Sequence, residues 1–187
     1  MLLTGQNIVK SFGKDDALTP VLKGVDIDLD SGEFVAIMGK SGSGKSTLLN
    51  ILSTLDTCDQ GQILYNGQDI SQLSDQEAAK LRLEDFGFVF QMPRMVKNLN
   101  ILDNILLPSL TYQSDRERAQ KEALALMEEV GIAALANKRI SQVSGGQLQR
   151  AGICRALINN PRLIFADEPT GALDSKSGQE VMELFSK

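Results

Sequence analysis

One glycine-rich segment limits what this chain can fold into more than any other part of the sequence. Residues 39–46 read GKSGSGKS and fit the phosphate-binding pattern G-x-x-x-x-G-K-[ST] in full. A continuously apolar run, residues 34–38, precedes them, and a helical pattern, residues 46–52, follows. Glycines let the backbone approach crowded phosphate oxygens, and converging N–H groups with a helix N-terminus favour an anion. The segment predicts a strand, a nucleotide-phosphate loop and a helix, with Lys45 on the β- and γ-phosphates and Ser46 on Mg²⁺.

A second motif is an apolar run that ends in two adjacent carboxylates. Residues 163–168 read Leu-Ile-Phe-Ala-Asp-Glu, which predicts a short buried strand that leads into a charged site. Many strands end in acidic turns, so the pattern gains its meaning from the phosphate loop upstream. With that loop it fits a Walker B motif, in which Asp167 holds Mg²⁺ directly or through water and Glu168 polarises the attacking water.

A third motif is Ser144-Gly145-Gly146-Gln147. One interpretation is an ordinary helix start, because Ser144 and Gln147 have the spacing of a capping box. However, two successive glycines weaken a helix start by roughly 1 kcal/mol each relative to alanine. They are better explained if the backbone must lie against a phosphate.

These three motifs, in this order and spacing, resemble the ATP-binding cassette of ABC proteins over residues 2–187, with Val143 where Leu is commonest and Lys40 where Pro is common. The resemblance implies ATP and Mg²⁺ as cofactors, Glu168, Gln91 and Lys45 as catalytic residues, and Ser46, Gln91 and Asp167 as metal ligands. It also implies that Phe12 stacks on adenine; the alternatives are that Phe12 is a core residue and, without the family context, that Gln91 is a surface glutamine. The expected nucleotide-contacting residues are Phe12, Gly39, Lys40, Ser41, Gly42, Ser43, Gly44, Lys45, Ser46, Thr47, Gln91, Ser144, Gly145, Gly146, Gln147 and Asp174, the last in a D-loop.

The expected fold is α/β, because strands alternate with helices. By resemblance it is a P-loop NTPase core of the RecA type, with a mostly parallel sheet, an N-terminal antiparallel β portion and an inserted helical subdomain. We expect one ABC ATPase domain over residues 1–187, with the core near 1–90 and 160–187 and the helical subdomain near 91–159.

Individual elements follow from local patterns. We expect residues 34–38 to be a central strand buried on both faces, and Asn66-Gly67 to turn a hairpin. Capping boxes at Ser74 and Ser114 predict two helix starts, and Ser144 opens a helix to about Leu157. Further patterns predict strands at 86–90 and 163–166, a loop-rich region between the prolines at 93 and 108, and a last helical stretch at 181–185.

Composition excludes several other classes of protein. The net charge of −5 argues against a nucleic-acid platform, and the absence of histidine excludes histidine-based zinc sites. Cys58 and Cys154 form no CxxC pair and are expected to be reduced thiols. No signal peptide is visible and the apolar runs are short, so work at a membrane would need a partner.

Members of the family carry a switch histidine on a strand after Walker B, and this sequence contains no histidine. We therefore expect a chain that is truncated at its C-terminus and hydrolyses ATP weakly.

The resemblance implies the ATP-hydrolysing subunit of an ABC transporter, on the cytoplasmic face of the inner membrane. Its expected partners are an integral-membrane permease and a second copy of itself in a head-to-tail, ATP-dependent dimer. Residues 67–71, 86–91 and 105–108 look similar to cassettes of the macrolide-export, lipoprotein-release and antimicrobial-peptide-resistance type. Those cassettes serve permeases that export or extract hydrophobic and amphipathic cargo. Two alternatives are a soluble ABC ATPase of DNA repair or translation and a non-hydrolysing nucleotide-sensing module. Glu168 argues against the second.

Overall fold

The computed structural model describes residues 1–14, 17–112, 115–171, 173, 178–179 and 182. The chain divides into two compact units, residues 1–80 and residues 81–187, which are described separately. Helix α2 (Asp75–Glu84) begins in the first unit and ends in the second. It starts at the predicted capping box, in which Ser74 N donates to Glu77 Oε2 at 2.9 Å. No helix among the described residues combines the length and apolar character needed to cross a membrane.

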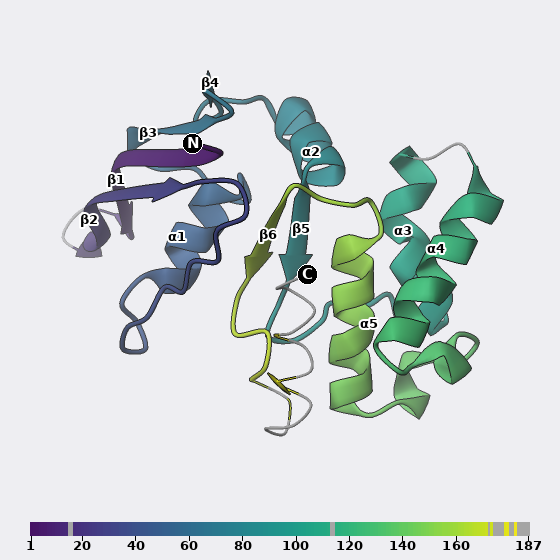
Figure 1. Cartoon of the computed structure of the whole chain (residues 1–187). Coiled ribbons are helices and arrows are strands. Elements are labelled where there is room, and N and C mark those ends of the chain that lie inside the picture. The colour runs from purple at the N-terminus through teal and green to yellow at the C-terminus, as the bar shows by residue number, and fades with distance from the viewer. Residues whose placement is uncertain (15–16, 113–114, 172, 174–177, 180–181, 183–187) are drawn as a thin grey trace. The chain divides into compact units, whose positions relative to one another are not determined.

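The first unit contains an antiparallel sheet (Figure 1). Its strands are β1 (Leu3–Phe12), β2 (Thr19–Leu29), β3 (Gln60–Tyr65) and β4 (Gln68–Asp69), in the order β2-β1-β3-β4. Every neighbouring pair is antiparallel, which confirms the predicted N-terminal antiparallel portion.

The turn between β3 and β4 confirms the predicted hairpin. Asn66 and Gly67 have φ values of 49° and 77°. A two-residue hairpin turn of type I′ requires positive φ at both central positions, and Asn-Gly tolerates this best.

Helix α1 (Lys45–Leu52) lies against this sheet and buries Leu48, Ile51 and Leu52. The packing is close, because a Cβ added at Gly5 of β1 would be 3.3 Å from Leu52 Cδ2. The helix that the sequence predicted after the glycine-rich loop is therefore confirmed.

The expectation for residues 34–38 was wrong. This segment belongs to no strand in the structure, and Phe34, Val35 and Met38 are 63%, 45% and 90% exposed. An apolar run alone does not make a strand, because a strand also needs a neighbour for its backbone hydrogen bonds. No described strand of residues 1–80 pairs with this segment.

The second unit contains two parallel strands, β5 (Phe86–Val89) and β6 (Leu163–Ala166), which confirm the two predicted strands. One face of the pair is aromatic. The ring centroids of Phe86 and Phe165 are 5.2 Å apart, and those of Phe88 and Phe165 are 5.9 Å apart. The alternation of side chains along a strand places Gly87 and Val89 on the opposite face.

Helix α5 (Gly145–Leu157) covers that opposite face (Figure 1). Ile153 and Ala156 pack with Val89, and a Cβ added at Gly87 would be only 2.8 Å from Ala156 O. A small residue at position 87 therefore lets the helix approach the strand.

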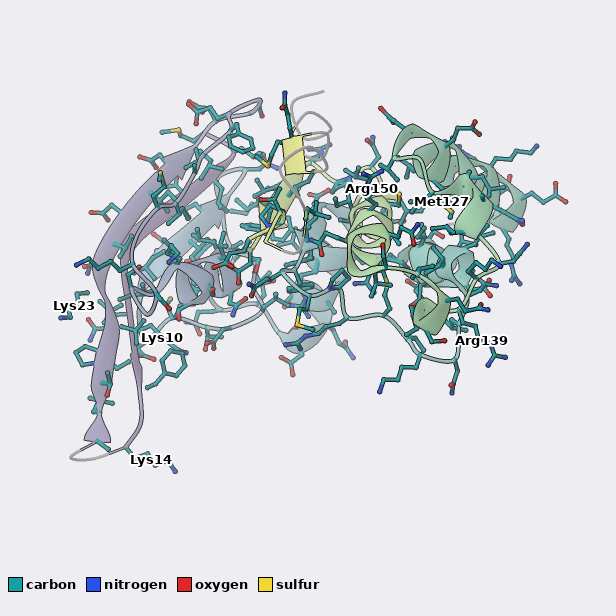
Figure 2. All side chains as sticks on the ribbon, turned by 90° about the horizontal axis from the view of Figure 1, so that it is seen from below. Lys10, Lys14, Lys23, Met127, Arg139 and Arg150 are labelled. Atoms are coloured by element: carbon teal, nitrogen blue, oxygen red, sulfur yellow. The ribbon has the colours of Figure 1, made fainter. Side chains whose placement is uncertain are left out.

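The other side of α5 packs against α3 (Ile101–Tyr112) and α4 (Arg116–Glu129). Two short 3₁₀ helices, η2 (Ala133–Leu135) and η3 (Ile140–Gln142), complete this region. Figure 2 labels Met127 on α4 and Arg150 on α5, and Arg150 Nη1 donates to Val130 O where α4 ends. The buried residues of this core are Ile101, Leu102, Ile105, Leu106, Ala119, Ala123, Met127, Val130, Ile132, Ala151, Cys154 and Ile158.

Helix α3 corrects a second expectation, because the sequence predicted loop-rich chain between the prolines. Pro108 lies inside α3 and costs roughly 3 kcal/mol for its missing N–H and its clash with the preceding turn. The helix buries Ile101, Leu102, Ile105 and Leu106, and each such side chain contributes about 1.5–3 kcal/mol. The stabilisation from burying these side chains therefore outweighs the free-energy cost of Pro108.

The start of α4 differs slightly from the expectation. Asp115 is the N-cap and accepts a hydrogen bond from Arg118 N at 3.0 Å, whereas Ser114 lies outside the described residues. The helix ends before Gly131, as predicted. Of the last helical stretch predicted at 181–185, only residue 182 is described, and it is helical.

Candidate functional site

The glycine-rich loop of the first unit turns tightly into α1. Gly42 and Gly44 have φ values of 77° and 93°, a region that Cβ-bearing residues avoid at a cost of roughly 1–2 kcal/mol. A Cβ added at Gly39 would be 2.8 Å from Ser43 Oγ. Gly44 is the N-cap of α1 and provides no side-chain acceptor, so the first N–H groups of the helix remain available to an anion.

The Lys45 ammonium group lies across this loop. Its Nζ donates to Gly39 O and to Lys40 O, each at 3.0 Å. The first turn of α1 carries no acidic side chain that would compete with a bound anion. The loop thus combines oriented N–H groups, a helix N-terminus and one fixed cation, which together suit a phosphate.

The other predicted residues of this segment lie on or near its surface. Lys40, Ser41, Ser43 and Ser46 are exposed, and Thr47 is half-buried. Exposure leaves the Ser46 hydroxyl accessible to a metal ion, but no contact in the structure assigns that role.

Phe12 is the last residue of β1, and its side chain is 45% exposed. Its ring is therefore not a core side chain, which was the alternative interpretation. Lys10 Nζ lies 5.3 Å from the ring centroid and also donates to Asp56 Oδ1 at 3.0 Å. Figure 2 shows Lys10 on the β1–β2 ribbon with Lys14 and Lys23. An exposed aromatic ring is compatible with stacking on adenine, which stays a prediction.

In the second unit, two predicted catalytic residues lie in contact. Gln91 Nε2 donates to Glu168 Oε2 at 2.7 Å. The two residues follow β5 and β6, and the parallel register brings the carboxyl ends of these strands together: Val89 pairs with Ala166, and Asp167 N donates to Val89 O at 2.9 Å. The structure therefore joins residues that are far apart in the sequence.

The backbone at Glu168 is strained. Its φ of 46° lies in the left-handed region, which a non-glycine residue adopts at a cost of about 1–3 kcal/mol. Strained residues of this kind cluster at functional sites, because the conformation aims a side chain that relaxed backbone would not. In this conformation the Glu168 carboxylate accepts the hydrogen bond from Gln91.

The donor set suits Mg²⁺, which prefers oxygen ligands and usually keeps water or phosphate oxygens around it. Gln91 donates through Nε2 to Glu168, so its Oε1 could serve as an oxygen ligand together with the carboxylates of Asp167 and Glu168. No group of three or more His, Cys, Asp or Glu side chains in the described parts of the chain could hold a metal by itself. A magnesium ion bound by these residues would need water or nucleotide oxygens as additional ligands.

The third motif forms the start of α5. Ser144 N donates to Gln147 Oε1 at 2.9 Å and Gln147 N donates to Ser144 Oγ at 3.3 Å, so the predicted capping box is present. Gly145 is open to approach, because a Cβ added there would meet nothing within 4 Å among the described residues, whereas one added at Gly146 would be 3.2 Å from Leu173 Cδ2. The capping and phosphate interpretations are therefore compatible. Asp174 lies outside the described residues.

Two residues of α5 that the sequence argument did not assign also belong to this region. Gln149 is fully buried, and its Nε2 donates to Phe90 O at 3.1 Å and to Pro169 O at 2.9 Å. Arg155 Nη1 donates to Arg94 O at 2.7 Å, and burial lowers the pKa of its guanidinium. A polar residue on the apolar side of a helix was the available signal, but the sequence did not reveal its partners.

Comparison with known proteins places these features in a family. The family model described as ABC transporter matches residues 22–171. The lipoprotein-releasing system ATP-binding protein LolD of Shewanella sp. is 44% identical over 98% of this chain and 80% of its own length. The macrolide export ATP-binding/permease protein MacB of Marinobacter nauticus is 47% identical over 99% of this chain, which spans only 29% of that protein.

A solved structure agrees with this placement. A dimeric ATP-binding cassette in a post-hydrolysis state, bound to ADP and Pi, superimposes with a TM-score of 0.92 at 40% identity, covering 98% of this chain and 81% of the other. This match confirms the predicted P-loop NTPase fold. The chain belongs to the ABC transporter family, as an ATP-binding domain.

Proposed function

We propose that this chain hydrolyses ATP to power a transporter that exports or extracts hydrophobic or amphipathic cargo. The observation that carries the proposal is the 2.7 Å hydrogen bond between Gln91 and Glu168 at the carboxyl ends of two parallel strands. A carboxylate that accepts from an amide keeps a second oxygen for water, so Glu168 can orient a nucleophile while Gln91 binds Mg²⁺ or the water.

The remaining site residues have distinct roles in this proposal. Lys45 exchanges its two carbonyl partners for the β- and γ-phosphate oxygens, and Ser46 and Asp167 bind Mg²⁺. Phe12 stacks on adenine. The γ-phosphate of a nucleotide held by a second copy of the chain is contacted by Ser144, Gly145, Gly146 and Gln147. Asp174, in the D-loop, contacts that second copy at the dimer interface.

The proposed cargo class rests on the relatives. MacB is named for macrolide export and LolD for a lipoprotein-releasing system. We infer from these names that the cargo of this chain's transporter is likewise hydrophobic or amphipathic. We place the chain at the cytoplasmic face of the inner membrane, held there by a permease subunit. The net charge of −5 disfavours the alternative of an ATPase that acts on nucleic acid. Weak hydrolysis by the 187-residue chain stays a prediction.

The proposed dimer is head-to-tail and forms around ATP. The solved relative that binds ADP and Pi is dimeric, and the start of α5 is open at Gly145 in the structure. The capping box uses the N–H groups of Ser144 and Gln147, so a phosphate from a partner would be bound by the N–H groups of Gly145 and Gly146.

A Glu168→Gln variant tests the proposal, because it keeps the size of the side chain and removes the charge that orients water. Light scattering is expected to show monomers without nucleotide and dimers with MgATP, and turnover is expected to be very slow. Adding Lys45→Ala to the same protein is the control that should abolish the ATP-dependent dimer. A folded Glu168→Gln protein that hydrolyses ATP at the wild-type rate would contradict the catalytic assignment.

A further inference from the structure

The buried amide of Gln149 holds the backbone on both sides of the catalytic pair. Its Nε2 donates to Phe90 O at 3.1 Å and to Pro169 O at 2.9 Å. Phe90 directly precedes Gln91, and Pro169 directly follows Glu168. One planar NH₂ group with two fixed donor directions therefore connects the two segments that carry Gln91 and Glu168.

The same face of α5 holds the segment after Gln91 at two further points. A Cβ added at Gly152 would be 3.1 Å from Pro93 Cβ, so the proline packs directly on the helix backbone. Arg155 Nη1 then donates to Arg94 O at 2.7 Å. Positions 149, 152 and 155 are neighbours along one helix face. The segment from Phe90 to Arg94 thus follows α5 and has little freedom to move without it.

Stability alone explains this amide poorly. Gln149 is fully buried, yet its Oε1 accepts no hydrogen bond from any described residue. A buried polar atom without a partner costs about 1–3 kcal/mol, which offsets much of what the two donated bonds contribute. A methionine of similar length would fill the same space without that cost, but it could not bind two carbonyl groups.

We propose that Gln149 is a positioning residue for ATP hydrolysis. It fixes the distance between Gln91 and Glu168. Because Gln149 belongs to α5, a movement of this helix would change that distance, and the helix begins with the proposed nucleotide-contacting motif at Ser144. This inference rests on the proposed role of Glu168. Gln149 is fully buried and acts through the backbone carbonyls that it binds.

The test compares Gln149→Met with Asn159→Leu, a matched control. Asn159 also donates one amide to a backbone carbonyl, Leu83 O at 3.0 Å, and its Oδ1 also lacks a partner among the described residues. Both variants lose a side-chain amide from the same unit, buried at Gln149 and half-buried at Asn159, but only Gln149 adjoins the catalytic pair. Single-turnover hydrolysis and ATP affinity are measured for each, and stability is measured by urea unfolding.

For Gln149→Met we expect kcat to fall at least about tenfold, with the Kd for MgATP within about twofold of wild type. For Asn159→Leu both kcat and the Kd for MgATP should stay within about twofold of wild type, whatever the loss of stability in this variant. Combined with Glu168→Gln, Gln149→Met should slow hydrolysis no further, because residues that act as a unit are not additive.

Two results would overturn the inference: an unchanged kcat in folded Gln149→Met, or a loss of kcat that only parallels stability in both variants. If Gln149→Met does not fold, Gln149→Asn replaces it, since it keeps the amide but shortens its reach, and unchanged turnover would again refute the role. Failure of the proposed function is distinguishable, because it would appear as wild-type turnover in Glu168→Gln alone.

Discussion

The strained backbone at Glu168 predicts that a glycine variant is more stable than an alanine variant at this position, which reverses the usual order. Glu168 has a φ of 46°, so any Cβ-bearing residue at this position carries a left-handed cost of about 1–2 kcal/mol that glycine avoids. Glycine in turn loses more conformational entropy on folding, roughly 0.5–1 kcal/mol relative to alanine. Glu168→Gly should therefore be more stable than Glu168→Ala by up to about 1.5 kcal/mol, and by about 0.75 kcal/mol at the midpoints of the two ranges. Both variants lose the bond to Gln91, so that loss cancels in the comparison.

The neighbouring residue Asp167 provides a control, because there we expect the alanine variant to be more stable than the glycine variant. Asp167 is not among the residues with positive φ, so no left-handed cost applies there. Asp167→Gly should be less stable than Asp167→Ala by roughly 0.5–1 kcal/mol, the ordinary cost of glycine. Urea unfolding measures both differences, and in a chain of this size 1 kcal/mol corresponds to about 2–4 °C in Tm. If alanine were the more stable replacement at both positions, the strain at Glu168 would be refuted.

Three further predictions concern packing, capping and thiols. Gly87→Ala should lower the free energy of unfolding by about 1–3 kcal/mol in urea titrations, because its Cβ would be 2.8 Å from Ala156 O; an unchanged midpoint would show that α5 can shift at no cost. Ser144→Ala should cost about 1 kcal/mol in the same assay through loss of the N-cap bond at 3.3 Å, and stability equal to wild type would exclude the cap. Burial raises the pKa of Cys154 to about 12 and also raises that of Cys58, so both thiols are neutral at pH 8. Ellman's reagent should then label partly accessible Cys58 slowly and leave buried Cys154 unlabelled until unfolding, whereas rapid reaction of both would contradict the burial.

The features that the sequence predicted correctly depend on residues close together in the chain. The Asn66-Gly67 turn and the Ser144–Gln147 capping box involve interactions within four residues, so local chemistry determines them. The helix after the glycine-rich loop belongs to the same class. The resemblance predicted catalytic roles for Gln91 and Glu168 but not the hydrogen bond between them, because no local pattern relates two loops that are so distant in the sequence.

The errors arose where tertiary partners decide the outcome. Residues 34–38 looked like a buried strand because they are apolar, but periodicity does not reveal whether a neighbouring strand exists. Pro108 suggested a loop because the burial of α3 against α4 and α5 could not be read from the sequence. Gln149 remained unassigned for the same reason, since its two acceptors lie in other segments.

The central claim is that the glycine-rich loop binds the phosphates of ATP through Lys45. Isothermal titration with MgATP tests it most directly, on the wild-type protein, on Lys45→Ala and on Lys40→Ala. Lys40→Ala is the matched control, because it removes one positive charge at an exposed position of the same loop and keeps the backbone N–H, through which we expect position 40 to contact phosphate. We expect a loss of affinity of at least about tenfold for Lys45→Ala, since charge-assisted bonds to phosphate each contribute about 1.5–3 kcal/mol. Lys40→Ala should stay within about threefold of wild type, as befits a solvent-exposed charge. Unchanged affinity in a folded Lys45→Ala protein would contradict the assignment of this loop as the nucleotide site.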